Sequence, residues 1–97
     1  MLAGIVEFQY DTVWINVDVY SVIPEIWGCP LAMHEDAVSV PVGAVLQDPS
    51  DLDKLTPINP GNDGRLPVVL NTVSLLHSKI GDIYPILGHA TGPVSLA

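Results

Sequence analysis

Basic residues are scarce in this chain of 97 residues. Lys54, Arg65 and Lys79 are its only lysines and arginines, against 11 acidic residues, and the formal net charge is −8. Nucleic acids and anionic membrane surfaces are bound through clustered lysine and arginine side chains. The composition therefore argues against both as partners.

Cysteine and long apolar runs are scarce as well. Cys29 is the only cysteine, so the chain forms no internal disulfide and cannot complete a thiolate zinc cage by itself. No apolar run approaches the roughly 20 residues of a membrane span, and the N-terminus lacks the basic start and cleavage site of a signal peptide. We expect a cytoplasmic location, where thiols stay reduced.

Apolar residues are abundant instead. Hydrophobic residues make up 48% of the chain and charged residues 14%, with a mean hydropathy of +0.41. A chain of this length buries only about 60–65% of its unfolded surface on folding, so a free-standing domain needs more polar surface than this. We therefore expect residues 1–97 to be a fragment, truncated at both ends, that aggregates or folds only in part when isolated.

Two apolar segments are typical of strands buried in a parallel sheet. Residues 12–17 (TVWINV) are rich in β-branched and aromatic side chains and end at Asp18, and residues 84–89 (YPILGH) form the second segment. Between them, residues 64–80 predict an amphipathic helix, because one apolar stripe recurs at helical spacing. That stripe consists of Leu66, Val69, Leu70, Val73, Leu76 and Ile80.

Several residues mark the ends of this helix and of shorter elements. Asn62 or Asp63 can cap the long helix, and Gly81 can end it. Pro67 suits its first turn, as Pro93 suits the first turn of a new helix. The shorter expected elements are a helix end over residues 1–9, a short helix over 19–28 that stops at Gly28, extended edge structure or a covering loop over 38–46, one helical turn over 48–52 with Ser50 as its cap, and a loop over 57–64.

Two apolar strands joined through a helix favour a right-handed parallel β–α–β crossover. The connection is longer than the dozen or so residues that such a crossover needs, so we expect residues 30–62 to form an insertion on the rim of the sheet. A parallel pair needs cover on both faces and both edges. The predicted fold class is α/β, with about two parallel strands and their connecting helices.

Four residues at the ends of the predicted strands are candidates for a functional site. Ligands of parallel α/β folds meet the carboxyl ends of the strands. This rule selects Asp18 after the first strand as a catalytic candidate. It selects His89, Thr91 and Gly92 at the end of the second strand as substrate-binding candidates.

Each candidate also has a structural interpretation. Asp18 can cap a helix that starts at the next residue or the one after. His89 can be a packed, hydrogen-bonded core histidine. The turn from Thr91 to Pro93 can exist for backbone shape, with Gly92 permitting the close approach of a ligand.

No metal site is predicted. His34, Glu35 and Asp36 are adjacent in sequence and cannot easily converge on one ion, so they favour a solvated loop. His77 is expected to be solvated on the long helix. We interpret Cys29 as a small buried hydrophobe and not as a zinc ligand or nucleophile.

In their order along the chain, these segments resemble the uroporphyrinogen decarboxylase superfamily. YDTVWINVDVYSVIPEIWGC resembles the family's strand that ends in Asp and leads to a Glu-x-x-Gly turn, here Glu25 to Gly28. DPSDLDKL and NDGRLPVVLNTVSLLHSKIGD resemble its connecting helix, and PILGHATGPVSLA resembles its next strand with a Gly-Pro turn. The resemblance implies a TIM (β/α)8 barrel, and residues 1–97 would be roughly a third of one such barrel domain, given about 250 residues for a typical barrel.

The decarboxylase branch of that family serves porphyrin biosynthesis. There the Asp that matches Asp18 binds the pyrrole N–H groups of a tetrapyrrole and stabilises a cationic intermediate, a role that suits an anionic acceptor. That branch also uses an arginine-containing N-terminal loop for the carboxylates of its substrate. Arg65 is the only arginine here, so this loop has no counterpart.

In the methyltransferase branch, the resemblance implies transfer of a methyl group from a methylated corrinoid protein to a thiol such as coenzyme M. A zinc ion held by His and Cys residues activates that thiol, and its ligands lie in the C-terminal half of the barrel, outside this chain. The DLDKL link and the GRLPVVL helix look closer to this branch, whereas His89 and Val94 depart from the family's usual residues.

We therefore predict a fragment of a corrinoid-dependent methyltransferase, inactive by itself. Two alternatives remain open: a tetrapyrrole decarboxylase, which is a lyase, and a corrinoid or tetrapyrrole binding protein without catalysis. A downstream His-x-Cys pair with a later Cys would favour methyl transfer. An upstream arginine-rich loop would favour decarboxylation.

Overall fold

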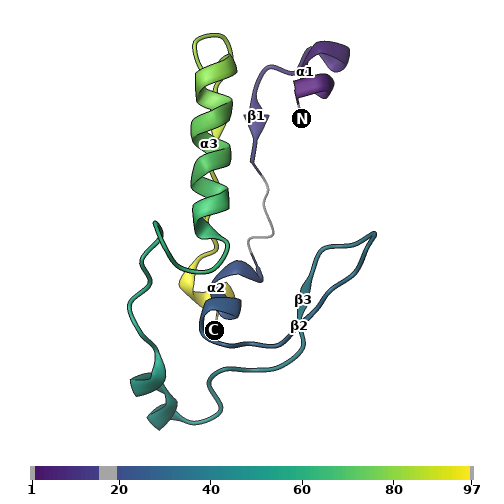
Figure 1. Ribbon diagram of the computed structural model, residues 1–97. Coiled ribbons are helices and arrows are strands. Elements are labelled where there is room, and N and C mark those ends of the chain that lie inside the picture. The colour runs from purple at the N-terminus through teal and green to yellow at the C-terminus, as the bar shows by residue number, and fades with distance from the viewer. Residues whose placement is uncertain (1, 16–19, 97) are drawn as a thin grey trace.

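The computed structural model describes residues 2–15 and 20–96 (Figure 1). The chain begins with α1 (Leu2–Phe8), so the helix predicted at the N-terminus is confirmed. Gln9 ends this helix in the left-handed region of backbone space, with φ 51°. The chain can therefore turn at once towards the first strand.

Two parallel strands form the centre of the fold. β1 (Val13–Trp14) pairs with β4 (Ile86–Leu87). The N–H of Val13 donates to the Pro85 carbonyl at 2.9 Å, and the N–H of Ile15 donates to the Leu87 carbonyl at 3.0 Å. The predicted parallel pair is thus confirmed over a shorter span than expected, and residues 16 and 17 lie outside the described part of the chain.

The long helix α3 (Leu66–Ile80) covers this pair, as predicted. Its Leu76 is buried in one cluster with Ile5, Val13 and Ile15. Most of the predicted apolar stripe is at least half-buried, but Leu70 is 47% exposed, so its predicted place in the core is wrong. The core lies between α1, β1 and the C-terminal half of α3, and half-buried side chains of Val73, Ile80, Tyr84 and Ile86 pack against it.

The residue at the N-terminal cap of α3 differs from the prediction, whereas the residue that ends the helix agrees with it. Arg65 occupies the N-cap position without a side-chain cap, so the prediction of Asn62 or Asp63 as the cap is wrong. The Asp63 carboxylate instead accepts the backbone N–H of Asn59 at 2.6 Å, which closes the preceding loop. Gly81 follows the helix as predicted. A Cβ there would lie 2.6 Å from the His77 carbonyl oxygen, so a larger residue would force the backbone to shift.

An insertion at the rim separates β1 from α3, as the sequence predicts. It contains α2 (Val22–Ile26) and an antiparallel hairpin of β2 (Leu31–Ala32) and β3 (Val40–Pro41). Gly28 has φ 85° and comes shortly after α2, so the predicted stop is confirmed. The extended segment predicted over residues 38–46 contains β3, whereas its partner β2 was not predicted.

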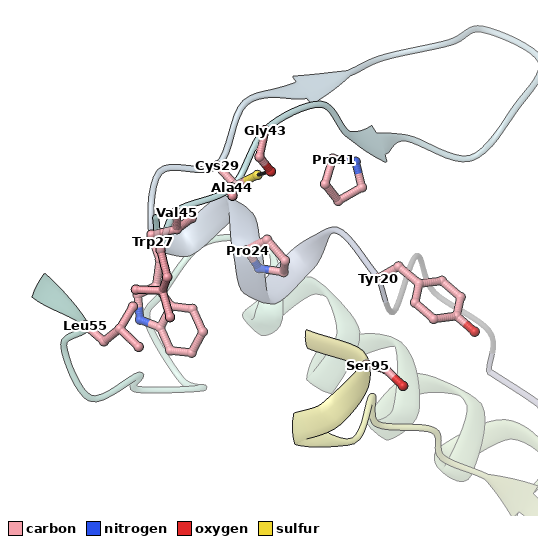
Figure 2. Close-up of a pocket in the computed structure, with 11 residues that line it drawn as sticks. Tyr20, Pro24, Trp27, Cys29, Pro41, Gly43, Ala44, Val45, Leu55 and Ser95 are labelled. Carbon is pink, nitrogen blue, oxygen red and sulfur yellow. Dashed lines mark hydrogen bonds between the residues drawn. The ribbon is translucent and has the colours of Figure 1, made fainter. Parts of the chain in front are cut away.

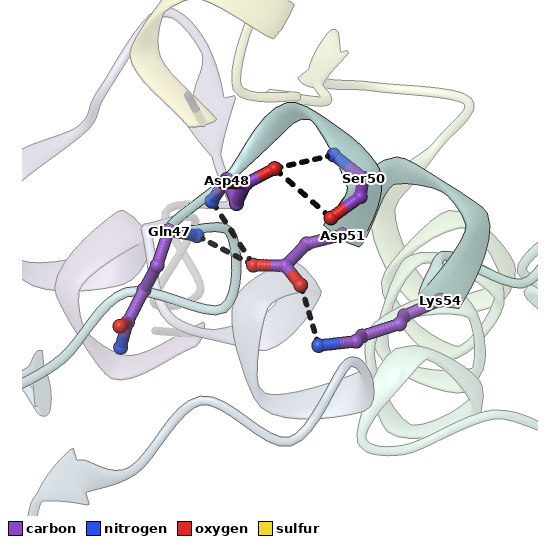
Figure 3. A network of polar contacts seen from close by, with 5 residues as sticks. All are labelled: Gln47, Asp48, Ser50, Asp51 and Lys54. Atoms are coloured by element: carbon purple, nitrogen blue, oxygen red, sulfur yellow. Dashed lines mark hydrogen bonds and ion pairs between the residues drawn. The ribbon is translucent and has the colours of Figure 1, made fainter.

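The helical turn predicted over residues 48–52 is a 3₁₀ helix, η1 (Pro49–Lys54) (Figure 3). Its cap is Asp48 and not Ser50, so that prediction is wrong. The Asp48 carboxylate accepts the N–H of Ser50 at 3.0 Å and the hydroxyl of Ser50 at 2.9 Å. A carboxylate one residue before the proline satisfies an N–H that the first turn leaves without a helical partner.

Asp51 completes this cap from the other side (Figure 3). Its carboxylate accepts the N–H groups of Gln47 and Asp48 at 2.9 and 3.1 Å, and it pairs with the Lys54 ammonium. The Lys54 hydrogen bond and these two N–H groups all favour the ionised form, and they lower the pKa of Asp51 to about 2. The two aspartates form a capping box that fixes the turn.

The chain is less compact than a folded monomer of its size. Its accessible surface is 7106 Å², compared with ~5,400 Å² for a folded monomer of this mass. Its radius of gyration is 16.0 Å, compared with ~12.5 Å for a compact domain of this length. Within residues 2–15 and 20–96, none of the helices is long and apolar enough to cross a membrane.

Replacing Leu76 with alanine should destabilise the fold by about 2–5 kcal/mol, because Leu76 is 5% exposed and its loss leaves a cavity against β1. Leu75→Ala is the matched control in the same helix, since Leu75 is 56% exposed. The shift in the urea midpoint of the full-length enzyme measures the change in stability for each variant. Equal shifts for the two variants would contradict the assigned core.

The stability that the capping box contributes should fall at low pH. Asp51 has a pKa of about 2 in the folded chain and about 3.9 in an unfolded one. Ionised Asp51 therefore stabilises the fold above pH ~4, and this contribution is lost as the pH falls through about 2. An NMR titration of its carboxyl carbon should have a midpoint of about 2, and Asp51→Asn should remove the associated pH dependence of stability. Asp53→Asn, at an exposed position of η1, should leave that dependence unchanged.

Candidate functional site

The carboxyl ends of β1 and β4 lie side by side, because the two strands are parallel and paired in register. The chain leaves both strands at this edge, which is where ligands of parallel sheets bind. Asp18, the predicted catalytic residue, lies outside the described residues, which resume at Tyr20. Among the described residues, the edge is therefore built from the segment after β4 and from the segment that starts at Tyr20.

His89 comes shortly after β4 and is exposed at this edge in the described part of the chain. Its ring lies edge-on to the Trp14 ring of β1, with 5.8 Å between the ring centroids and 61° between the ring planes. The contact joins the two strand ends through their side chains. An exposed imidazole in this place can donate or accept a hydrogen bond, and its role in substrate binding remains a prediction.

Thr91 and Gly92 come next in the chain. Thr91 is half-buried, and Gly92 is exposed with no atom within 4 Å of the position where a Cβ would stand. The Gly92 carbonyl accepts the N–H of Ser95 at 3.1 Å and opens the short helix α4 (Pro93–Leu96). The new helix predicted at Pro93 is confirmed. Packing does not require glycine at position 92 in the described part of the chain, and its role in substrate binding stays a prediction.

The N-terminus of α2 bears on the interpretation of Asp18. Among the described residues, α2 begins at Val22 and Ser21 occupies its N-cap position, so a start at Tyr20 is not observed, whereas residue 19 lies outside the described part of the chain. Asp18 itself is outside the described residues, so its suggested capping role is not tested. Its predicted catalytic role stays a prediction.

A polar cluster at the same edge was missed by sequence reasoning. Arg65 pairs with Glu25 of α2, with 2.6 Å between Nε and Oε2, and donates to the Ser21 hydroxyl at 2.9 Å. Ser21 is fully buried, and its hydroxyl lies 3.0 Å from that of Ser39 in the hairpin segment. The cluster joins the start of α2, the hairpin and the start of α3. Separations of 40 and 44 residues hide it from local patterns; the only signal is that Arg65 is the sole arginine.

A cavity of about 290 Å³ opens beside α2 (Figure 2). Trp27 and Leu55 form one end of it, and the Tyr20 and Ser95 side chains lie at the other. Among the described residues, those that line the cavity carry no charge, and most are apolar. It suits an uncharged, largely apolar group.

Two contacts fix the wall of this cavity. The indole N–H of Trp27 donates to the Thr56 carbonyl at 3.1 Å, which holds the link after η1 against α2. Cys29 is buried, and its thiol lies 3.2 Å from the Gly43 carbonyl, where it donates a weak hydrogen bond. The interpretation of Cys29 as a small buried side chain is confirmed.

Metal-binding side chains are dispersed in the described part of the chain. No three of its His, Cys, Asp or Glu residues are grouped so that they could hold a metal ion. His34, Glu35 and Asp36 are exposed in the loop between β2 and β3, and His77 is exposed on α3. The predicted solvated positions of these side chains are confirmed. The described residues therefore offer no donor set for zinc.

Comparison with known proteins gives one match. The sequence model of the family described as uroporphyrinogen decarboxylase (URO-D) matches residues 1–97, which is the whole chain. No curated protein matches, and no solved structure does. The family's enzymes have parallel α/β folds, and the β1–β4 pair with α3 between its strands agrees with that architecture. The chain belongs to the uroporphyrinogen decarboxylase family.

Proposed function

We propose that this chain is one part of a (β/α)8-barrel enzyme of the cytoplasm that transfers a methyl group from a methylated corrinoid protein to a thiol. Residues 1–97 would form part of a single barrel domain, whose remaining strands and helices cover the apolar side chains that α3 and the β1–β4 pair leave exposed here. Membership of an enzyme family and the parallel β1–β4 pair support this proposal. The buried reduced thiol of Cys29 suits the compartment.

One observation favours methyl transfer over decarboxylation: the guanidinium of Arg65 is already paired within the chain and is not free to bind a substrate carboxylate. This guanidinium is engaged by Glu25 and Ser21 of the same chain. Lys54 is likewise paired with Asp51, and Lys79 lies in the last turn of α3, at the end of the fold away from the candidate edge. A substrate rich in carboxylates needs cations at its binding edge. Transfer of a methyl group from a corrinoid protein does not require cations at this edge.

The chain's own residues would bind and orient in this reaction. Asp18 would supply an acceptor-only anion at the strand end, where it can accept hydrogen bonds from the bound group. His89, Thr91 and Gly92 would contact the substrate from the β4 side. No step is assigned to zinc within this chain, because the described residues hold no donor set for it.

Decarboxylation of a tetrapyrrole is the second candidate. It is favoured by the description of the family itself, uroporphyrinogen decarboxylase. Asp18 would then contact pyrrole N–H groups, and arginines from elsewhere in the protein would hold the carboxylates. A barrel that binds corrinoid or tetrapyrrole without catalysis is the alternative from another class.

Asp18→Asn in the full-length enzyme should lower kcat/KM about 10²–10³-fold, the usual cost of removing one group that stabilises charge in the transition state. Methyl transfer from free methylcobalamin to coenzyme M and decarboxylation of uroporphyrinogen are measured side by side. Activity in the first assay alone supports methyl transfer, and activity in the second alone supports the other branch. Asp11→Asn, exposed before β1, is the control. Wild-type turnover by Asp18→Asn would remove Asp18 from the site.

Arg65→Met should destabilise the fold by about 1–3 kcal/mol, because it leaves the Glu25 carboxylate and the buried Ser21 hydroxyl without their charged donor. The KM for substrate should stay unchanged if Arg65 is structural, as proposed. Thermal melting and steady-state kinetics of the same preparation test both points. A raised KM with an unchanged melting temperature would mean that Arg65 binds substrate.

A further inference from the structure

The β2–β3 hairpin has one face turned inward and one turned outward. Ser39 is buried against Ser21 of the α2 N-cap, and Pro41 lines the cavity beside α2. The N–H of Val42 donates to the Pro30 carbonyl at 3.0 Å and extends the pairing by one step. The inward residues alternate with outward ones, so the hairpin is anchored by one face only.

The outward face is apolar, which its position does not explain. Val38, Val40 and Val42 are 63, 51 and 62% exposed, and Met33 in the loop between the strands is 70% exposed. Outward positions of a half-covered strand are usually polar. Three valines on alternate positions form an exposed strip on a hairpin that projects away from α3 (Figure 1). Such a strip marks a surface that another molecule covers.

The acidic charge around the valine strip indicates what kind of molecule can cover it. Residues 1–53 contain no lysine or arginine. They contain nine of the 11 acidic residues, which are Glu7, Asp11, Asp18, Glu25, Glu35, Asp36, Asp48, Asp51 and Asp53. Glu35 and Asp36 are exposed at the tip of the hairpin itself. The strip therefore lies in a strongly negative field.

A second copy of the chain fits this surface poorly. It would bring the same excess of carboxylates, and two of its three cations are engaged by its own Glu25 and Asp51. Complementary potentials favour the association of unlike surfaces. The partner must therefore offer an apolar groove together with lysine or arginine side chains.

We propose that the β2–β3 hairpin is a docking arm for a basic protein, which covers Val38, Val40 and Val42 with an apolar strip and pairs its cations with Glu35 and Asp36. The hairpin is tied through Ser39 and Ser21 to the segment beyond the carboxyl end of β1. A partner docked there lies beside the candidate site. The proposal does not depend on which reaction that site performs.

The test measures binding of a labelled peptide of alternating lysine and valine to the full-length enzyme by fluorescence anisotropy. Peptides of alternating glutamate and valine, and of alternating lysine and serine, are the matched probes. The lysine–valine peptide should bind at least about tenfold more tightly than either, since apolar and charged contacts both contribute. Amide hydrogen exchange should then slow within residues 31–42.

Two sets of variants locate the binding surface. Replacing all three valines by threonine keeps β-branched side chains, and Glu35→Gln with Asp36→Asn removes charge from the exposed tip. Each should weaken binding of the lysine–valine peptide about tenfold or more. The controls are Val68→Thr on α3, and Glu7→Gln with Asp11→Asn, all exposed and distant in sequence; these should change binding less than about twofold, as for residues outside an interface.

Three results would overturn the proposal. Equal binding of the lysine–serine peptide would show charge attraction alone. Unchanged binding by both hairpin variants would place the surface elsewhere. Absence of binding to the wild-type chain would mean that another part of the protein covers the valines. If the threonine variant fails to fold, as judged by circular dichroism, the tip variant carries the test, because its two positions are exposed.

Discussion

The parallel pairing of β1 with β4 is the constraint on which the rest of this structure depends. Parallel strands cannot be joined by a tight turn, so the chain must leave at the carboxyl end of β1 and return at the amino end of β4. α3 makes this return and buries Leu76 against Val13 and Ile15. The described residues between β1 and α3 consequently lie beyond the carboxyl ends of the paired strands, which is the edge where parallel sheets bind ligands (Figure 1).

The segments at this edge are held by polar contacts, because few apolar side chains there are buried. Arg65, Glu25, Ser21 and Ser39 join α2, the hairpin and the start of α3. A second polar cluster, the capping box of Asp48 and Asp51, fixes η1 and engages Lys54. The chain thus commits two of its three cations to its own architecture.

Short-range sequence patterns predicted the elements that neighbouring residues determine. Apolar spacing predicted α3, runs of β-branched residues predicted β1, and glycine predicted the ends of α2 and α3. The failures have physical reasons. Leu70 fits the helical stripe, but burial depends on which segments pack over the helix, and among the described residues none covers it. Ser50 and Asp63 are good caps in isolation, yet Asp48 and the loop contact to Asn59 compete more effectively. β2 is too short to produce a pattern.

The sequence by itself determined the α/β class, the crossover helix, the family and the candidates at the strand ends, since each depends on residue order and short-range spacing. Only the tertiary structure decided that His89 is exposed against Trp14, that Arg65 belongs to Glu25 and Ser21, and that the hairpin valines face outward. These facts depend on which distant segments meet. These long-range contacts result from burial and charge pairing over the whole fold, and a short stretch of sequence does not reveal them.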